Sequence, residues 1–183
     1  NVVEQIKMAL HAQETRAKRK ELKLETNFSP TAQNVYADHA RTIEILHNLI
    51  DNAVKYTEGG SVTATTQEEG EYIKISVADT GRGMTKDDMS RLGSKFFRTS
   101  NYIKSNQSDD FDIVRPGGSG LGLYVTFNLV RKMGGDIHVE SELNKGTSFI
   151  FTLPKYTDQK TKNGTDSKDM FERLGLKKDK DAI

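Results

Sequence analysis

The apolar positions of the chain follow two periods, one helical and one alternating. Helical spacing, in which apolar residues recur at i, i+3, i+4 and i+7, predicts three long helices and one short helix. These cover residues 2–20, 39–56, 121–133 and, for the short helix, 86–92. In the second helix the apolar stripe consists of Leu46, Leu49, Ile50 and Ala53.

Alternation of apolar and polar residues predicts five strands, four of which pair into two hairpins. The strands cover residues 21–26, 61–67, 72–79, 136–142 and 147–154, with the first ended by the NFSP turn. The helices fall between hairpins rather than after every strand. This order favours an α/β two-layer sandwich, in which about three helices back a mixed, largely antiparallel sheet.

Three parts of the chain differ in composition. We expect a helix that leads into the domain over residues 1–20, the domain itself over 21–154, and a polar tail over 155–183. The tail is poor in apolar residues, although residues 167–176 have the pattern of one short helix. Inside the domain, residues 93–120 form a long polar stretch.

Composition excludes several functions. The formal net charge of the 183 residues is +1, so no global field favours binding to nucleic acid or to a membrane surface. Cysteine is absent, which excludes disulfides, thiolate metal sites and a cysteine nucleophile. Apolar runs fall short of the ~20 residues of a membrane span, and there is no signal-peptide pattern, so we expect a cytoplasmic protein.

The polar face of the 39–56 helix carries Asn48, Asn52 and Lys55, nearly opposite the apolar stripe. Asparagine is a mediocre helix former, so two in register suggest a function. Amide oxygens suit Mg²⁺, which takes few protein ligands and keeps waters and phosphates, and a lysine one turn away can neutralise a phosphate. The alternative is a solvated polar face without a ligand.

A second candidate is VADTGRGM, residues 77–84, where a strand leads Asp79 into a turn with Gly81 and Gly83. A carboxylate at a strand end can accept a hydrogen bond from an exocyclic amine, and glycines let a flat base approach the backbone. A plain glycine turn is one alternative. Another is an aspartic protease, because its signature includes Asp-Thr-Gly, but a single copy would require a dimer.

The third candidate is RPGGSGLGLYV, residues 115–125, which places several glycines where a loop enters a helix. The free amides of a helix N-terminus can bind an anion. The segment lacks the Gly-Lys-Ser/Thr of a Walker loop and the spacing of a dinucleotide-binding loop. A simple hinge is the alternative reading of such a segment.

In this order the three motifs resemble the N box and the two glycine boxes of the ATP-binding catalytic domain of sensor histidine kinases. Their superfamily also holds gyrase-type ATPases, mismatch-repair ATPases and heat-shock chaperones. KFFR (95–98) is similar to the F box, and KGTSFIFTLP (145–154) to the final Gly-Thr strand. The resemblance covers roughly residues 20–154 and implies that ATP lies between sheet and helices under a mobile lid.

The resemblance also implies site residues. Its catalytic residues are Asn48, Lys55 and Arg98, and its Mg²⁺ ligands are Asn52 and Asn48. Asp79 matches the acceptor of the adenine amine, and Arg98 and Lys95 match contacts to the γ-phosphate. The ATP-binding residues implied are Asn52, Tyr56, Asp79, Gly81, Gly83, Lys95, Gly118, Gly120, Leu121, Gly122 and Thr147.

Position 48 bears on the reaction. In the ATPases of the superfamily a glutamate stands there and activates water, whereas the amide of Asn48 cannot act as a general base. We therefore expect a histidine protein kinase that transfers the γ-phosphate. The alternatives are an ATPase or serine kinase acting on a partner protein, and a degenerate nucleotide-sensing module.

The acceptor histidine is expected outside this chain. His11 lacks the acidic neighbour and helical context of the family's acceptor, and the other three histidines are equally unremarkable in their surroundings. The expected partners are a phosphoacceptor histidine domain of the same protein and a response regulator downstream. The parent protein is expected to be dimeric, and its anchoring to a membrane is left open.

Overall fold

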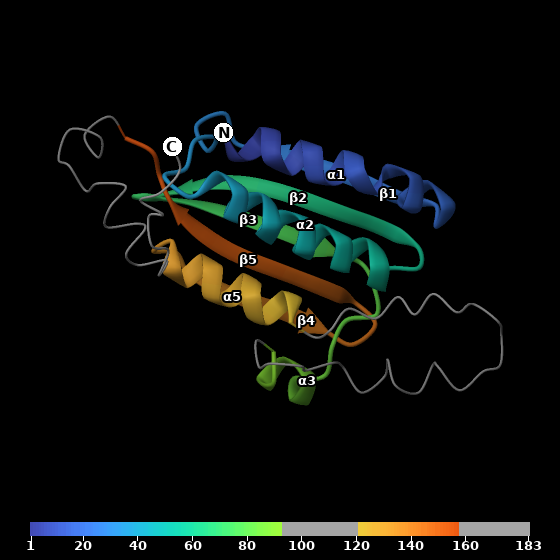
Figure 1. Ribbon diagram of the computed structural model, residues 1–183. Coiled ribbons are helices and arrows are strands. Elements are labelled where there is room, and N and C mark those ends of the chain that lie inside the picture. The colour runs from blue at the N-terminus through green and yellow to red at the C-terminus, as the bar shows by residue number, and fades with distance from the viewer. Residues whose placement is uncertain (93–120, 158–183) are drawn as a thin grey trace, which may run out of the picture.

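The computed structural model describes residues 1–92 and 121–157, in which three long helices lie on one face of a five-stranded sheet (Figure 1). A fourth, short helix lies beyond the sheet edge formed by β4. The elements are α1 (Val2–Arg19), β1 (Leu22–Phe28), α2 (His39–Tyr56), β2 (Gly60–Glu69), β3 (Tyr72–Asp79), α3 (Lys86–Ser90), α5 (Gly122–Lys132), β4 (Ile137–Glu142) and β5 (Gly146–Pro154).

The strand order is β1-β2-β3-β5-β4, with β1 parallel to β2 and all other neighbours antiparallel. This confirms the predicted mixed, largely antiparallel sheet. The predicted end of the first strand is wrong by two residues. Asn27 and Phe28 continue the pairing opposite Thr65 and Thr66, so the parallel ladder carries β1 past the expected turn.

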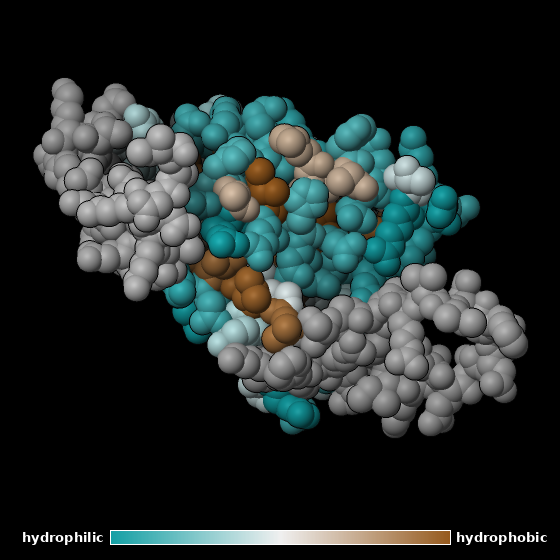
Figure 2. Space-filling model, viewed as in Figure 1, coloured by the Kyte–Doolittle hydropathy of each residue, from teal (hydrophilic) through white to brown (hydrophobic). Residues whose placement is uncertain are grey.

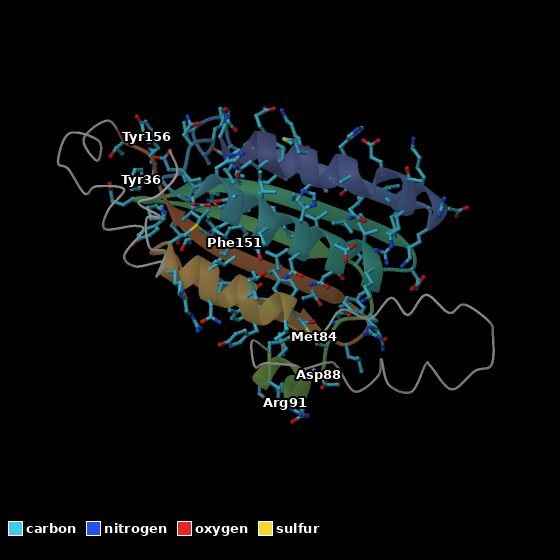
Figure 3. All side chains as sticks on the ribbon, viewed as in Figure 1. Tyr36, Met84, Asp88, Arg91, Phe151 and Tyr156 are labelled. Atoms are coloured by element: carbon cyan, nitrogen blue, oxygen red, sulfur yellow. The ribbon has the colours of Figure 1, made fainter. Side chains whose placement is uncertain are left out.

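The hydrophobic core fills the space between the sheet and the three long helices. Phe151 of β5 is fully buried and lies at the centre of this layer (Figure 3). Val2 and Ile6 of α1 are also fully buried, so the first helix belongs to the same core as the sheet. Each such side chain stabilises the fold by roughly 1.5–3 kcal/mol. The remaining fully buried large side chains are Ile45, Leu46, Leu49, Ile50, Val54, Val62, Ile73, Ile75 and Leu153.

The last described residues return to the loop that precedes α2. Val35 forms a β-bridge with Lys155, and the amide of Tyr156 donates to the carbonyl of Asn34 at 3.0 Å. Figure 3 shows Tyr36 and Tyr156 at the end of the sheet away from Met84. Main-chain pairing therefore continues past Pro154, and the glycine turns lie at the opposite end of the molecule.

Within the described ranges, no helix has both the length and the apolar character that crossing a membrane would require.

Candidate active site

The half-exposed amide side chains of α2 form a short chain of hydrogen bonds that leads to α5. Nδ2 of Asn48 donates to Oγ1 of Thr126 at 2.7 Å, and Nδ2 of Asn52 donates to Oδ1 of Asn48 at 3.4 Å. Thr126 is buried in α5, which fixes the first of these bonds. The chain of bonds leaves Oδ1 of Asn52 without a hydrogen bond from any described residue, so this oxygen is available to a cation.

The first residue of α5 lies directly against Asn48. A Cβ on Gly122 would come within 2.4 Å of Oδ1 of Asn48, which is far inside van der Waals contact. Leu121 precedes it as the N-cap residue, and no side chain of the described residues caps this end of the helix. The amides of the first turn of α5 are thus brought beside the two asparagines, where they can bind an anion.

Two cationic side chains flank one aromatic ring at the end of α2. Nζ of Lys55 lies 5.1 Å from the centroid of the Tyr56 ring, and Cζ of Arg82 lies 4.7 Å from the same centroid. The amide of Arg82 also donates to the Tyr56 carbonyl at 3.4 Å. The end of α2 and the loop after β3 therefore meet at a positively charged wall.

Asp79 is the last residue of β3 and is paired with Thr147 of β5. Its Oδ1 accepts a hydrogen bond from the amide of Gly81 at 2.8 Å. Burial raises the pKa of Asp79 above the ordinary value of 3.8, while hydrogen bonds from the amides of Gly81 and Thr147 and from the side chain of Thr57 oppose the rise. The side chain is therefore a partly buried carboxylate held in a fixed orientation.

Glycine is required around Asp79 by close approach of the backbone. A Cβ on Gly81 would lie 2.5 Å from the Tyr56 carbonyl oxygen, and one on Gly146 would lie 1.9 Å from the Asp79 carbonyl oxygen. Gly83 has φ +63° and its Cβ would lie 2.0 Å from the Glu142 carbonyl oxygen. The turns after β3 and before β5 consequently pack backbone on backbone.

Four side chains that the motifs did not single out hold this arrangement together. Oγ of Ser141 accepts from the Met84 amide at 2.9 Å and donates to the Gly146 carbonyl at 2.9 Å, tying the two glycine turns to each other. The other three are Thr57, Arg82 and Thr126, described above. Ser141 lies in the predicted strand 136–142 and Arg82 in the VADTGRGM motif, but the sequence shows the contacts of neither residue.

The structure brings together most of the residues predicted for the site. Asn48, Asn52, Lys55 and Tyr56 come from α2, Leu121 and Gly122 from the start of α5, and Thr147 from β5. Asp79 ends β3, and Gly81 and Gly83 lie in the turn that follows it. Asn48 and Tyr56 are eight residues apart on α2, which is about 12 Å along the axis and separates an amide end from a carboxylate end. Lys95, Arg98, Gly118 and Gly120 lie outside the described residues.

The family of the chain follows from its similarity to known proteins. A family model described as histidine kinase-, DNA gyrase B- and HSP90-like ATPase matches residues 37–157. The chain belongs to this family. The chain is 36% identical over 152 residues to the non-motile and phage-resistance protein of Caulobacter vibrioides, covering 79% of this chain and 17% of that protein. It is 35% identical over 130 residues to the signal transduction histidine-protein kinase BarA of Escherichia coli K12, covering 68% and 13%.

Solved structures support the same assignment. Full-length ShkA in complex with AMPPNP has a TM-score of 0.70 and 30% identity, with 86% of this chain and 30% of that chain covered. The catalytic domain of the histidine kinase ThkA has a TM-score of 0.69 and 25% identity, covering 85% and 95%. These likenesses confirm the predicted fold and the resemblance to the ATP-binding catalytic domain of sensor histidine kinases. The chain spans less than a fifth of the two curated relatives described above.

Proposed function

We propose that this domain binds ATP with Mg²⁺ and supplies the γ-phosphate to a histidine on a separate domain of the same protein. One observation carries the proposal: the partly buried carboxylate of Asp79 and the paired amides of Asn48 and Asn52 lie toward opposite ends of α2, with glycine turns and the start of α5 beside them. The glycine turn lets a base approach Asp79, and the start of α5 lies beside the amides. A nucleotide then extends along α2 from base to phosphates.

Each end of the site has a distinct task. Asp79 accepts a hydrogen bond from the adenine amine, and Thr147 and Gly81 hold its carboxylate in place. Lys55, three residues after Asn52, offers positive charge to the phosphates, and Arg82, three residues after Asp79, adds positive charge beside the Tyr56 ring. The residues fit Mg²⁺ because Oδ1 of Asn52 has no hydrogen bond from the described residues, and a single amide oxygen suits an ion that otherwise keeps waters and phosphates. When bound, Mg²⁺ offsets phosphate charge.

Transfer is favoured over hydrolysis by the chemistry of Asn48. An amide does not accept a proton at neutral pH, and both polar atoms of this one are bonded, to Thr126 and to Asn52. The residue can therefore orient phosphate or metal, but it cannot activate water as a general base. The ATPase and serine-kinase alternatives require such a base from another residue.

A partner surface lies beside the proposed phosphate end. Figure 2 shows a strip of apolar surface on α5 next to polar neighbours. Leu121 and Val125 are half-buried and lie one turn apart, and Leu129 continues the row toward the core, against which it packs. Partly exposed apolar side chains that gather in this way can mark an interaction surface. A phosphoacceptor helix docked there would bring its histidine near the Asn48 end, and a response regulator would receive the phosphoryl group afterwards.

Two measurements test the proposal. Calorimetry should detect ATP binding that strengthens with Mg²⁺. With γ-labelled ATP, the isolated chain should stay unlabelled, and label should appear on the histidine domain of the same protein when that domain is added. His11→Gln should change nothing, because His11 lies exposed on α1 and pairs with Glu14 at 3.1 Å. Label on the isolated chain that disappears in His11→Gln would contradict the separate acceptor.

A further inference from the structure

Lys20 reaches from the end of α1 to the end of α2. Its Nζ lies 3.1 Å from the carbonyl oxygen of Val54 and 2.9 Å from those of Lys55 and Thr57. A fourth contact joins it to Oε1 of Glu58 at 3.3 Å. The Lys20 side chain is 21% exposed, whereas that of Glu58 is 85% exposed, so the carbonyl contacts are the sheltered ones.

These contacts satisfy carbonyls at the end of α2 that the helix itself leaves without donors. The last carbonyls of a helix have no intrahelical donor, and together they carry a partial negative charge. Thr57, the C-cap of α2, is extended with φ −105° and ψ 125°, so the chain does not turn back to cap the helix itself. An ammonium group offers three donors to the same place and carries the opposite charge.

The backbone turn after Lys20 fixes its approach. Glu21 has φ 55°, and its amide donates to the Lys18 carbonyl at 3.1 Å, which ends α1 and directs the chain into β1. A left-handed residue after the last helical turn is a common helix ending. Lys20 is thus presented from a closed turn rather than from a free loop.

The turn that Lys20 caps carries the proposed nucleotide contacts. Lys55 and Tyr56 belong to it, and the Tyr56 carbonyl accepts from the Arg82 amide in the first glycine turn. Oγ1 of Thr57 donates to the Ala53 carbonyl at 2.8 Å, and the Thr57 side chain also helps to hold Asp79. A shift of this turn would therefore move the positively charged wall of Lys55 and Arg82 and the Asp79 carboxylate together.

We propose that Lys20 is a positioning residue of the nucleotide site, which it stabilises through the C-terminal turn of α2 without touching the ligand. The inference rests on the proposed function, because its effect is measured as ATP affinity. Lys20 also affects the charge of the proposed site. Its ammonium group covers the partial negative charge at the end of α2, beside the cations Lys55 and Arg82.

Arg16 provides a matched control. It lies one turn earlier on α1, and its guanidinium pairs with Asp51 of α2 at 2.9 Å. Arg16→Met therefore removes one charged link between the same two helices, but leaves the end of α2 capped. Lys20→Met keeps the side-chain length and removes the donors, and Lys20→Arg keeps the charge and the donors.

The experiment measures ATP binding by calorimetry, the midpoint of urea unfolding, and amide NMR shifts without nucleotide. Lys20→Met should weaken ATP binding about tenfold, Lys20→Arg should recover most of the loss, and Arg16→Met should bind as the wild type does. Amide signals of Thr57 and Gly81 should shift in Lys20→Met but stay in place in Arg16→Met.

Equal ATP affinities for Lys20→Met and Arg16→Met would overturn the positioning role, as would unmoved Thr57 and Gly81 signals. If Lys20→Met unfolds, Lys20→Gln at lower temperature serves for the same comparison. Failure of the wild type to bind ATP would instead refute the proposed function. In that case the amide shifts alone decide whether Lys20 positions the turn.

Discussion

The two ends of the candidate site are built in different ways. At the Asp79 end, glycine turns meet backbone on backbone, with Gly146 so close to the Asp79 carbonyl that a Cβ would lie 1.9 Å away. At the Asn48 end, a side-chain amide of α2 contacts α5 through the bond of 2.7 Å from Asn48 to Thr126, and a bond of 3.4 Å within α2 links Asn52 to Asn48. Backbone packing has few alternative arrangements, whereas amide side chains can rotate.

The difference suggests a division of labour in binding. A preformed base pocket loses little conformational entropy when a ligand binds, so contacts made there contribute almost fully to the binding free energy. The phosphate end can adjust its amides, which suits a group that arrives with Mg²⁺ and leaves one phosphate shorter. Substitutions at the Asp79 end should therefore affect folding and binding together, and those at the Asn48 end should affect phosphate recognition alone.

The largest effect is expected from Gly146→Ala. The new Cβ would meet the Asp79 carbonyl, and φ +114° is strained for alanine, so we expect a loss of about 3–5 kcal/mol in unfolding free energy and no measurable ATP binding. Urea unfolding and calorimetry provide both values.

Gly70→Ala is the matched control for that substitution. Gly70 also has positive φ, +58°, but a Cβ there meets nothing within 4 Å. It should lose about 1–2 kcal/mol from backbone strain alone and keep its ATP affinity. Similar behaviour of the two variants would show that the turn around Asp79 is not tightly packed.

Asp79→Asn should have the next largest effect. It removes the charge from the adenine acceptor, and a charge-assisted hydrogen bond contributes about 1.5–3 kcal/mol, so ATP affinity should fall about 10- to 100-fold. Adenosine should lose as much as ATP, since the contact is to the base. Asp87→Asn on the exposed surface of α3 is the control. Unchanged affinity by calorimetry would remove Asp79 from the base pocket.

Much of this architecture could be predicted from the sequence, for a physical reason. Long helices and hairpins bury one face, so the spacing of their apolar residues is visible in the local sequence. The predicted elements therefore match the structure closely. The motifs likewise placed Asp79 and the two asparagines. The contact between Asn48 and Thr126 joins residues 78 positions apart, however, and no local pattern shows which face of α5 will cover α2.

The supporting residues of the site escaped prediction for the same reason. Ser141 lies 57 residues from Met84, and Lys20 lies 37 residues from Thr57. Serine and lysine on a surface element are ordinary, and they become informative only when the fold brings a partner to them. The polar face of α2 was open to two interpretations; the bond from Asn48 to Thr126 shows that this face is not simply solvated, and ligand binding stays a prediction.

Asn52→Ala tests the phosphate end. If Oδ1 of Asn52 binds Mg²⁺, the variant should lose most of the affinity that Mg²⁺ adds to ATP, about tenfold, while adenosine binding and the unfolding midpoint stay unchanged. Calorimetric titrations with Mg²⁺ and with a chelator give the comparison. A variant that still responds fully to Mg²⁺ would assign the ligand to another residue.

Gly122→Ala should separate folding from phosphate binding. Alanine suits a helix interior better than glycine by about 0.5–1 kcal/mol, and loss of the bond from Asn48 to Thr126 costs a similar amount, so the unfolding free energy should change little. Its Cβ would nevertheless lie 2.4 Å from Oδ1 of Asn48, and the amide must turn away from Thr126. We expect ATP affinity to fall about three- to tenfold and adenosine affinity to stay constant. An equal loss of affinity for ATP and for adenosine would contradict the proposed difference between the Asn48 end and the Asp79 end.

The smallest effect is a pH dependence at Asp79 in which stability and binding move in opposite directions. Because burial raises its pKa in the folded state above the ordinary value of 3.8, the folded protein takes up this proton at a higher pH than the unfolded chain does. The resulting stabilisation is complete below the unfolded pKa and is lost as the pH rises through the folded pKa. On acidification through that window, the wild type should therefore gain unfolding free energy relative to Asp79→Asn. Its ATP affinity should fall over the same window, because the protonated carboxyl is a weaker acceptor, and a parallel fall in both quantities would contradict this assignment.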